Sequence, residues 1–158
     1  GSQLEYLLYY NVTNRAPENV ISFAVSSDGT SGGRTFVDGE ALVADKWYFL
    51  VAWHDASADT VNIVVDNGAV NSVAHTLGVF NSTAQFRIST LNPSSPIFFL
   101  DGQIAQAMMY KRVLSNSERL RLYLEPLAGV LAPRRMIVGS AVSAIPTFVT
   151  PWQLRFGR

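Results

Sequence analysis

The sequence contains no cysteine, which excludes a disulfide framework and a zinc site held by thiolates. It has no excess charge of one sign either, because 12 basic residues balance 12 acidic residues. A chain without such an excess lacks the field that holds nucleic acid or an anionic membrane surface, so we expect neither as a partner. The longest apolar run, residues 136–149, contains Pro146 and is shorter than the roughly 20 residues of a membrane-spanning helix, so we expect no membrane insertion.

Catalytic patterns are equally scarce. The two histidines, His54 and His75, are not accompanied by a Gly-x-Ser-x-Gly motif, and the sequence has no phosphate-binding loop. His54 and Asp55 are adjacent, but neighbouring residues of a strand point to opposite faces, so we do not expect them to form a catalytic pair. Asp55 is instead predicted to open a turn. We therefore predict that the protein is not an enzyme.

Most of the chain alternates with the period of a β-strand, and turn residues separate the runs. Residues 4–12 and 20–29 are predicted to be neighbouring strands, the second ending at Asp28-Gly29. A short strand is predicted at residues 34–37, before a turn at Asp38-Gly39.

Residues 45–55 are predicted to form a central strand, because apolar side chains occupy both of its faces. The following run ends at Asn67-Gly68, a strong hairpin signal. Its alternation points Val61, Ile63 and Val65 into the core and Thr60, Asn62, Val64 and Asp66 outward. Further strands are predicted within residues 69–77, 84–90 and 96–114.

One helix is predicted, with Ser115 as its N-cap. Glu118 follows three residues later, so the two residues match a capping box. The predicted apolar stripe of this helix consists of Leu120, Tyr123 and Leu124. The pattern as a whole predicts an all-β protein, an antiparallel β-sandwich of the jelly-roll type with eight or more strands and one short helix.

Four stretches of the sequence follow one another in a familiar order: ISFAVSSDGT (21–30), LVADKWYFLVAWHDASADTVNIVVDNGAV (42–70), FRIST (86–90) and FFLDGQIAQAMMYKRVLSNSERLRLY (98–123). They resemble the concanavalin A-like lectin/glucanase superfamily, specifically its laminin G-like jelly rolls of bacterial and phage type. The resemblance implies a concanavalin A-like jelly roll with a binding role.

The same resemblance frames the domain organisation. We expect a jelly roll over residues 1–126 and a C-terminal arm over residues 127–158, which packs on the body or on a partner. One or two strands usually precede the equivalent of residues 5–12 in this family. We expect those strands either to lie outside this sequence, which starts with a Gly-Ser pair typical of an expression vector, or to be replaced by the arm.

Glucanases of the superfamily carry a Glu-x-Asp-x-Glu pattern on one strand, because two carboxylates must share a face in a retaining mechanism. This sequence has no such pattern, and each of its five glutamates is isolated from a second carboxylate at that spacing. A divergent polysaccharide hydrolase is therefore the least favoured function.

The leading hypothesis is a non-catalytic carbohydrate-binding or surface-adhesion module, extracellular or associated with a virion, whose partner is a glycan or another surface ligand. Sugar binding requires aromatic platforms beside hydrogen-bonding side chains. The candidate ligand-binding residues are Tyr10, Asn11, Arg34, Trp53, His54 and Asp55. The alternative is a structural domain of a phage virion or tail, in which the arm mediates self-association or binds a virion protein.

Calcium is the one cofactor that the sequence suggests. Aspartates at turns suit a hard cation that prefers oxygen ligands. The candidate calcium ligands are Asp28, Asp55, Asp59 and Asp101. Aspartate is also common in turns for conformational reasons alone, and that interpretation stays open beside the calcium site.

Overall fold

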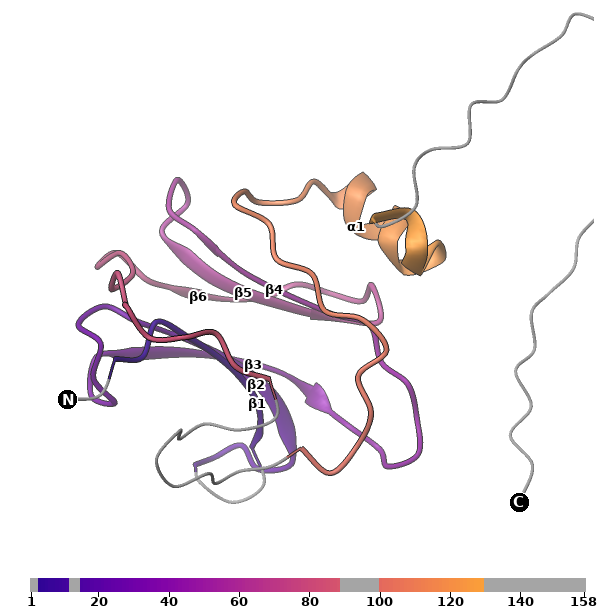
Figure 1. The fold of residues 1–158 in the computed structure, drawn as a ribbon, viewed down its shortest axis with the longest axis horizontal. Coiled ribbons are helices and arrows are strands. Elements are labelled where there is room, and N and C mark those ends of the chain that lie inside the picture. Colours follow the sequence, from indigo (N-terminus) through magenta and orange to yellow (C-terminus); the bar gives the residue numbers. More distant parts are fainter. Residues whose placement is uncertain (1–2, 12–14, 89–99, 130–158) are drawn as a thin grey trace, which may run out of the picture.

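The computed structural model describes residues 3–11, 15–88 and 100–129. Within these residues six strands form two three-stranded antiparallel sheets that pack face to face (Figure 1). One sheet contains β1 (Tyr6–Asn11), β2 (Val20–Ser26) and β3 (Arg34–Ala41). The other contains β4 (Leu50–Asp55), β5 (Thr60–Val65) and β6 (Asn71–Ala74). The predicted antiparallel sandwich with one short helix is confirmed.

The core lies between the two sheets and is built mainly by their central strands. Its buried side chains alternate along β2 and β5 and are completed by one residue of β3: Ile21, Phe23, Val25, Val37, Val61, Ile63 and Val65. Full burial of such a side chain stabilises a fold by about 1.5–3 kcal/mol. The prediction that alternate residues of β5 point inward is confirmed.

The first sheet confirms one turn prediction and contradicts another. β1 and β2 pair as predicted, from Tyr6 opposite Val25 to Asn11 opposite Val20. However, the predicted Asp38-Gly39 turn is wrong, because both residues lie inside β3. A Cβ atom at Gly39 would lie 2.7 Å from the Ile21 side chain, next to a register shift between β2 and β3. The glycine thus allows close strand packing rather than a chain reversal.

The prediction that residues 45–55 form a central strand is wrong for the described part of the sheet, where β4 is an edge strand and β5 is central. Both faces of β4 are apolar for another reason. On its inner face Leu50 and Ala52 pack against the core. On its outer side the helix α1 (Asn116–Leu124) lies across the sheet (Figure 1), and the Tyr123 ring is 5.6 Å from that of Phe49.

The helix also changes the outer face of β5. Asn62 and Val64 alternate with the core residues as predicted, but both are buried instead of half-exposed. A side chain that points away from the sandwich core is therefore not solvent-facing on this sheet.

The hairpin between β5 and β6 is confirmed, with a shift in its turn. The Gly68 N–H donates to the Val65 carbonyl at 2.9 Å, and the positive φ angles fall on Asp66 (49°) and Asn67 (56°). This geometry matches a type I′ turn whose central residues are Asp66 and Asn67, one position earlier than the Asn-Gly pair suggests.

Two further strand predictions are contradicted where the structure describes them. Residues 84–88 and 100–113 contain no strand, and apolar side chains remain exposed there, including Phe86 at 68%. A strand requires a partner for its backbone N–H and C=O groups as well as an alternating pattern. The rest of these two predictions, residues 89–90 and 96–99, falls outside the described residues.

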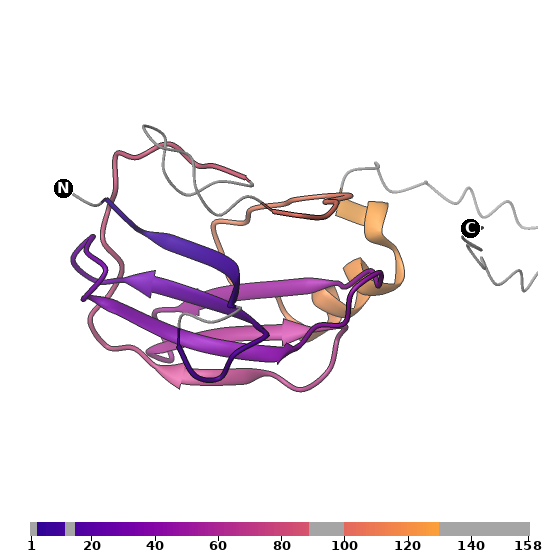
Figure 2. The same ribbon diagram turned by 90° about the horizontal axis from the view of Figure 1, so that it is seen from below.

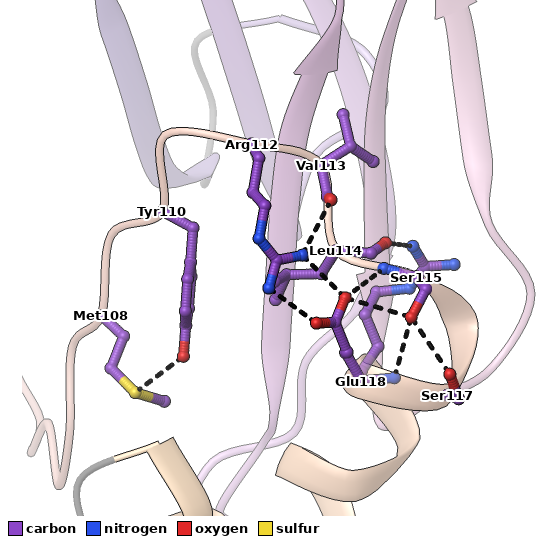
Figure 3. A network of polar contacts seen from close by, with 9 residues as sticks. Met108, Tyr110, Arg112, Val113, Leu114, Ser115, Ser117 and Glu118 are labelled. Carbon is purple, nitrogen blue, oxygen red and sulfur yellow. Dashed lines mark hydrogen bonds and ion pairs between the residues drawn. The ribbon is translucent and has the colours of Figure 1, made fainter.

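The capping box of α1 is confirmed (Figure 3). Glu118 N–H donates to Ser115 Oγ at 3.3 Å, and Ser115 N–H donates to Glu118 Oε2 at 2.9 Å. The Arg112 guanidinium donates to both carboxylate oxygens of Glu118 at 2.8 and 2.6 Å. These hydrogen bonds, that from Arg112 first, lower the pKa of Glu118 to about 2. The helix is followed by a short 3-10 helix, η1 (Pro126–Gly129).

The predicted apolar stripe of α1 is not the buried face of the helix, although one of its members, Tyr123, packs beside Phe49. The buried residues of the helix are Arg119 and Leu122, whereas the three stripe residues are exposed: Leu120, Tyr123 and Leu124. Arg119 contacts Trp53 of β4 with its guanidinium group, 4.5 Å from the centroid of the ring. Hydropathy patterns count arginine as polar, so they miss a helix face that docks through a guanidinium group.

Candidate functional site

The outer face of the β1–β2–β3 sheet carries the densest group of aromatic and charged side chains that do not serve the sandwich core. Figure 2, a view from below, looks onto this sheet. The register places Tyr9, Ser22 and Asp38 side by side across the three strands. Arg34 and Phe36 alternate with Val37 and so share the outer face with Asp38. We name this group, with Arg15 from the β1–β2 loop, the Phe36 cluster: Tyr9, Arg15, Arg34, Phe36 and Asp38.

Phe36 is the centre of the cluster. The guanidinium carbons of Arg15 and Arg34 lie 4.4 and 5.1 Å from the centroid of its ring. The Tyr9 ring meets it edge-on, with centroids 6.3 Å apart and an interplanar angle of 70°. Both cations are within the range of cation–π attraction, and the two aromatic rings adopt a favourable edge arrangement. The ring thus holds two guanidinium groups close together.

One of the two arginines is neutralised. Arg15 binds Asp38 through both of its terminal nitrogens, including Nη1 to Oδ2 at 2.9 Å. Ser22 Oγ donates to Asp38 Oδ1 at 2.6 Å. Burial raises the pKa of Asp38, but the hydrogen bonds from Arg15 and Ser22 and the charge of Arg15 outweigh burial, so that the pKa is lowered overall. Asp38 is therefore an ionised acceptor near neutral pH.

Asn11, a predicted ligand-binding residue, is 0% exposed and has a different role. Its amide donates to the carbonyls of Arg15 at 2.7 Å and Pro17 at 2.6 Å. These two hydrogen bonds fix the loop that carries Arg15 over β2. Asn11 therefore positions the loop that carries Arg15 instead of facing a ligand.

Arg34, the second predicted ligand-binding residue on this face, uses only part of its hydrogen-bonding capacity. Its Nε donates to the Ser31 carbonyl at 2.9 Å. Among the described residues, no hydrogen bond or ion pair involves its two terminal nitrogens. The cluster consequently contains two guanidinium groups and one carboxylate, which leaves a net positive charge at Arg34.

The other predicted ligand-binding aromatics lie elsewhere. Trp53 is on the outer face of the second sheet, where the Arg119 guanidinium covers its ring at 4.5 Å. Tyr10 alternates with Tyr9, so it points to the inner face of β1, opposite the core residue Ile21, and is 39% exposed. Neither belongs to the Phe36 cluster.

His54 and Asp55 diverge as predicted. The His54 ring lies 5.4 Å from that of His75 between the sheets. Burial, followed by the nearby His75, lowers the pKa of His54, and its Nε2 has no hydrogen-bond partner within the part of the chain that the structure describes. Asp55 Oδ1 accepts hydrogen bonds from the backbone of Ser57 at 3.0 Å and Ala58 at 3.1 Å, so Asp55 opens the turn after β4 as expected.

The predicted calcium ligands are not brought together. Asp28 lies after β2, where its Oδ1 accepts from Thr30 N–H at 2.8 Å. Asp55 ends β4 and Asp59 lies in the turn that follows it, while Asp101 lies in the segment of residues 100–113 that contains no strand. Among the residues that the structure describes, no three acidic, histidine or cysteine side chains group in a way that could hold a metal ion.

Sequence reasoning missed most of this site. The stretch Arg34-Thr35-Phe36-Val37-Asp38 contained a usable signal, because its alternation puts Arg34, Phe36 and Asp38 on one face. The predicted turn at Asp38-Gly39 concealed that signal. No local pattern points to Arg15, because the loop conformation alone brings it over Phe36.

Comparison with known proteins agrees with the fold. The family model of the concanavalin A-like lectin/glucanases superfamily that describes laminin G-like domains matches residues 1–118. Searches of curated proteins and of solved structures each gave no significant match. None of the helices in the described ranges has the length and apolar character needed to span a bilayer.

The family match indicates a general class of function but does not identify a ligand. Laminin G-like domains are generally non-catalytic, although the wider superfamily includes glucanases, so the match fits a lectin-like or other binding module. The match covers well over half of the sequence and agrees with the two-sheet antiparallel sandwich. The chain therefore belongs to the concanavalin A-like lectin/glucanase superfamily.

Proposed function

We propose that this protein is a non-catalytic carbohydrate-binding module and that the Phe36 cluster is its binding site. The observation that carries the proposal is a half-exposed aromatic pair, Tyr9 and Phe36, beside a bidentate Arg15–Asp38 ion pair on the outer face of a sheet. Membership of a superfamily that includes lectins supports a binding role.

The cluster offers both kinds of contact that a saccharide requires. The apolar C–H face of a sugar ring packs against the accessible surface of aromatic rings, and Tyr9 and Phe36 are both only partly buried. Each carboxylate oxygen accepts up to two hydrogen bonds, and Asp38 Oδ2 accepts only one, from Arg15, among the described residues. Asp38 thus keeps capacity for a sugar hydroxyl while its position is fixed by Arg15 and Ser22.

The electrostatics of the cluster favour binding over hydrolysis. A glycosidase needs a carboxylic acid whose pKa is raised, so that it can protonate the leaving oxygen. The pKa of Asp38 is instead lowered by Arg15 and Ser22, which keeps Asp38 ionised. An acceptor that stays charged holds a hydroxyl but does not donate a proton to it.

A glycan array probed with the purified chain tests the proposal. We expect binding to a limited set of saccharides and a loss of about fivefold or more in affinity for Phe36→Leu, because packing on an aromatic ring contributes about 1 kcal/mol or more. Phe86→Leu is the matched control: Phe86 is 68% exposed and lies outside both sheets, so this variant should bind normally. Binding to no saccharide, or equal loss in both variants, would contradict the proposal.

A further inference from the structure

The Phe36 cluster is electrostatically incomplete. Two guanidinium groups lie within 4.4 and 5.1 Å of one ring centroid, so their like charges raise the local positive potential. The single carboxylate in contact with them, Asp38, binds both terminal nitrogens of Arg15. Nothing in the described structure plays the corresponding part for Arg34. The terminal N–H groups of Arg34 are therefore available to bind one more anion.

The orientation of Arg34 is already fixed for such an anion. Its Nε donates to the Ser31 carbonyl at 2.9 Å, and its guanidinium lies against Phe36. A guanidinium held at its Nε and against an aromatic ring loses little further side-chain entropy when its remaining N–H groups bind a ligand. Those groups form a planar fork that matches a carboxylate with two parallel hydrogen bonds.

We infer that the saccharide bound by the Phe36 cluster is acidic and that its carboxylate pairs with Arg34. The inference rests on the proposed carbohydrate-binding function and adds the chemical class of the ligand. The Tyr9 and Phe36 rings contact the sugar ring, Asp38 accepts from a hydroxyl, and Arg34 receives the carboxylate. A neutral sugar leaves the positive charge of Arg34 unpaired, so it binds more weakly.

Matched saccharides that differ only at the carboxyl group provide the test: an oligogalacturonate and its methyl ester, a glucuronate-containing oligomer and its glucose counterpart, and a sialylated glycan and its sialic acid methyl ester. We expect the acidic member of at least one pair to bind about tenfold or more tightly, as for one charge-assisted bidentate contact. This preference should weaken as ionic strength rises.

Two substitutions assign the preference to Arg34. Arg34→Gln removes the charge and should make the acidic and neutral members bind equally, while Arg34→Lys keeps the charge without the planar fork and should retain part of the preference. Arg87→Gln is the control, because Arg87 is exposed and, among the described residues, its one side-chain hydrogen bond is to Gln85. The unfolding midpoint of each variant verifies that the fold is intact.

The outcomes separate this inference from the proposed function. Binding of neutral members as tightly as acidic ones, or an acidic preference that survives Arg34→Gln, overturns the inference and leaves carbohydrate binding in place. A preference for sulfated glycans over carboxylated ones also overturns it, because the assigned group is a carboxylate. Binding to no saccharide at all overturns the proposed function, and the inference falls with it.

Discussion

The outer faces of the two sheets each hold a guanidinium group against an aromatic ring. On the β4–β5–β6 sheet, Arg119 covers Trp53, is 8% exposed, and donates to the Leu114 carbonyl and to Asn116. On the β1–β2–β3 sheet, Arg34 is half-buried against Phe36 and keeps two nitrogens without a partner in the described structure. Both sheets have the same guanidinium–aromatic contact. The burial of the arginine and the number of its N–H groups without a partner therefore decide whether the arginine stabilises the fold or is available to a ligand.

The largest effect is expected on the outer face of the β4–β5–β6 sheet, which α1 covers. Arg119→Ala should lower the free energy of unfolding by about 2–3 kcal/mol, because it uncovers Trp53 and leaves the buried Leu114 carbonyl without its donor. Urea denaturation followed by tryptophan fluorescence measures the change.

Arg121→Ala on the same helix is the control. The Arg121 side chain is 61% exposed and, of the described residues, pairs only with the exposed Glu125, so its removal should cost less than about 0.5 kcal/mol. If Arg119→Ala costs no more than Arg121→Ala, the helix does not depend on the arginine contact, and the two faces do not differ as described.

The second-largest effect is expected at Asn11, which holds the loop that carries Arg15 to the Phe36 cluster. Asn11→Ala should destabilise the protein by about 2 kcal/mol, because two carbonyls of the β1–β2 loop lose their donor. The same variant should weaken saccharide binding, since the loop carries Arg15 to Phe36. Chemical denaturation and the glycan array give the two readings. Asn81→Ala, at an exposed position, should change neither, and normal binding by a destabilised Asn11→Ala would show that the loop does not position the site.

A smaller effect is expected at the helix N-terminus. Ser115→Ala removes the N-cap acceptor of Glu118 N–H and should cost about 1 kcal/mol. Saccharide binding should not change, because α1 covers the opposite sheet (Figure 1). Ser117→Ala, two residues later and exposed, controls for the loss of a hydroxyl group, because the Ser117 hydroxyl lies 3.1 Å from that of Ser115 but does not cap Glu118 N–H. A fall in affinity for Ser115→Ala alone would mean that the two faces are coupled through the core.

Sequence patterns were most informative where the determining interactions are local. The capping box needs only Ser115 and Glu118, and the hairpin turn needs only Asp66 and Asn67 with their neighbours. The core alternation of β5 was predicted for the same reason, since period-two hydrophobicity is a property of consecutive residues. The antiparallel sandwich followed from the sum of these local signals.

The features of the fold and of the site that the sequence did not predict depend on contacts between residues far apart in the chain. The apolar outer face of β4 predicted a central strand, but α1, more than 60 positions later, covers it instead. The role of Arg15 depends on the conformation of a loop that Asn11 holds, and the burial of Arg119 depends on the position of Trp53. No hydropathy window contains both members of such pairs, so the candidate site was identified only in part, through Arg34.

The smallest expected effect on stability is at Arg34. Arg34→Gln should change the free energy of unfolding by less than about 0.5 kcal/mol, because the side chain is half-buried and its terminal nitrogens make no hydrogen bond or ion pair with a described residue. Arg15→Gln is the matched comparison on the same ring. It should cost about 1–2 kcal/mol, since Asp38 then stays partly buried without its cationic partner. Paired urea titrations measure both values. A cost for Arg34→Gln equal to that of Arg15→Gln would make Arg34 a structural residue like Arg119, and the distinction between the two faces would then rest on exposure alone.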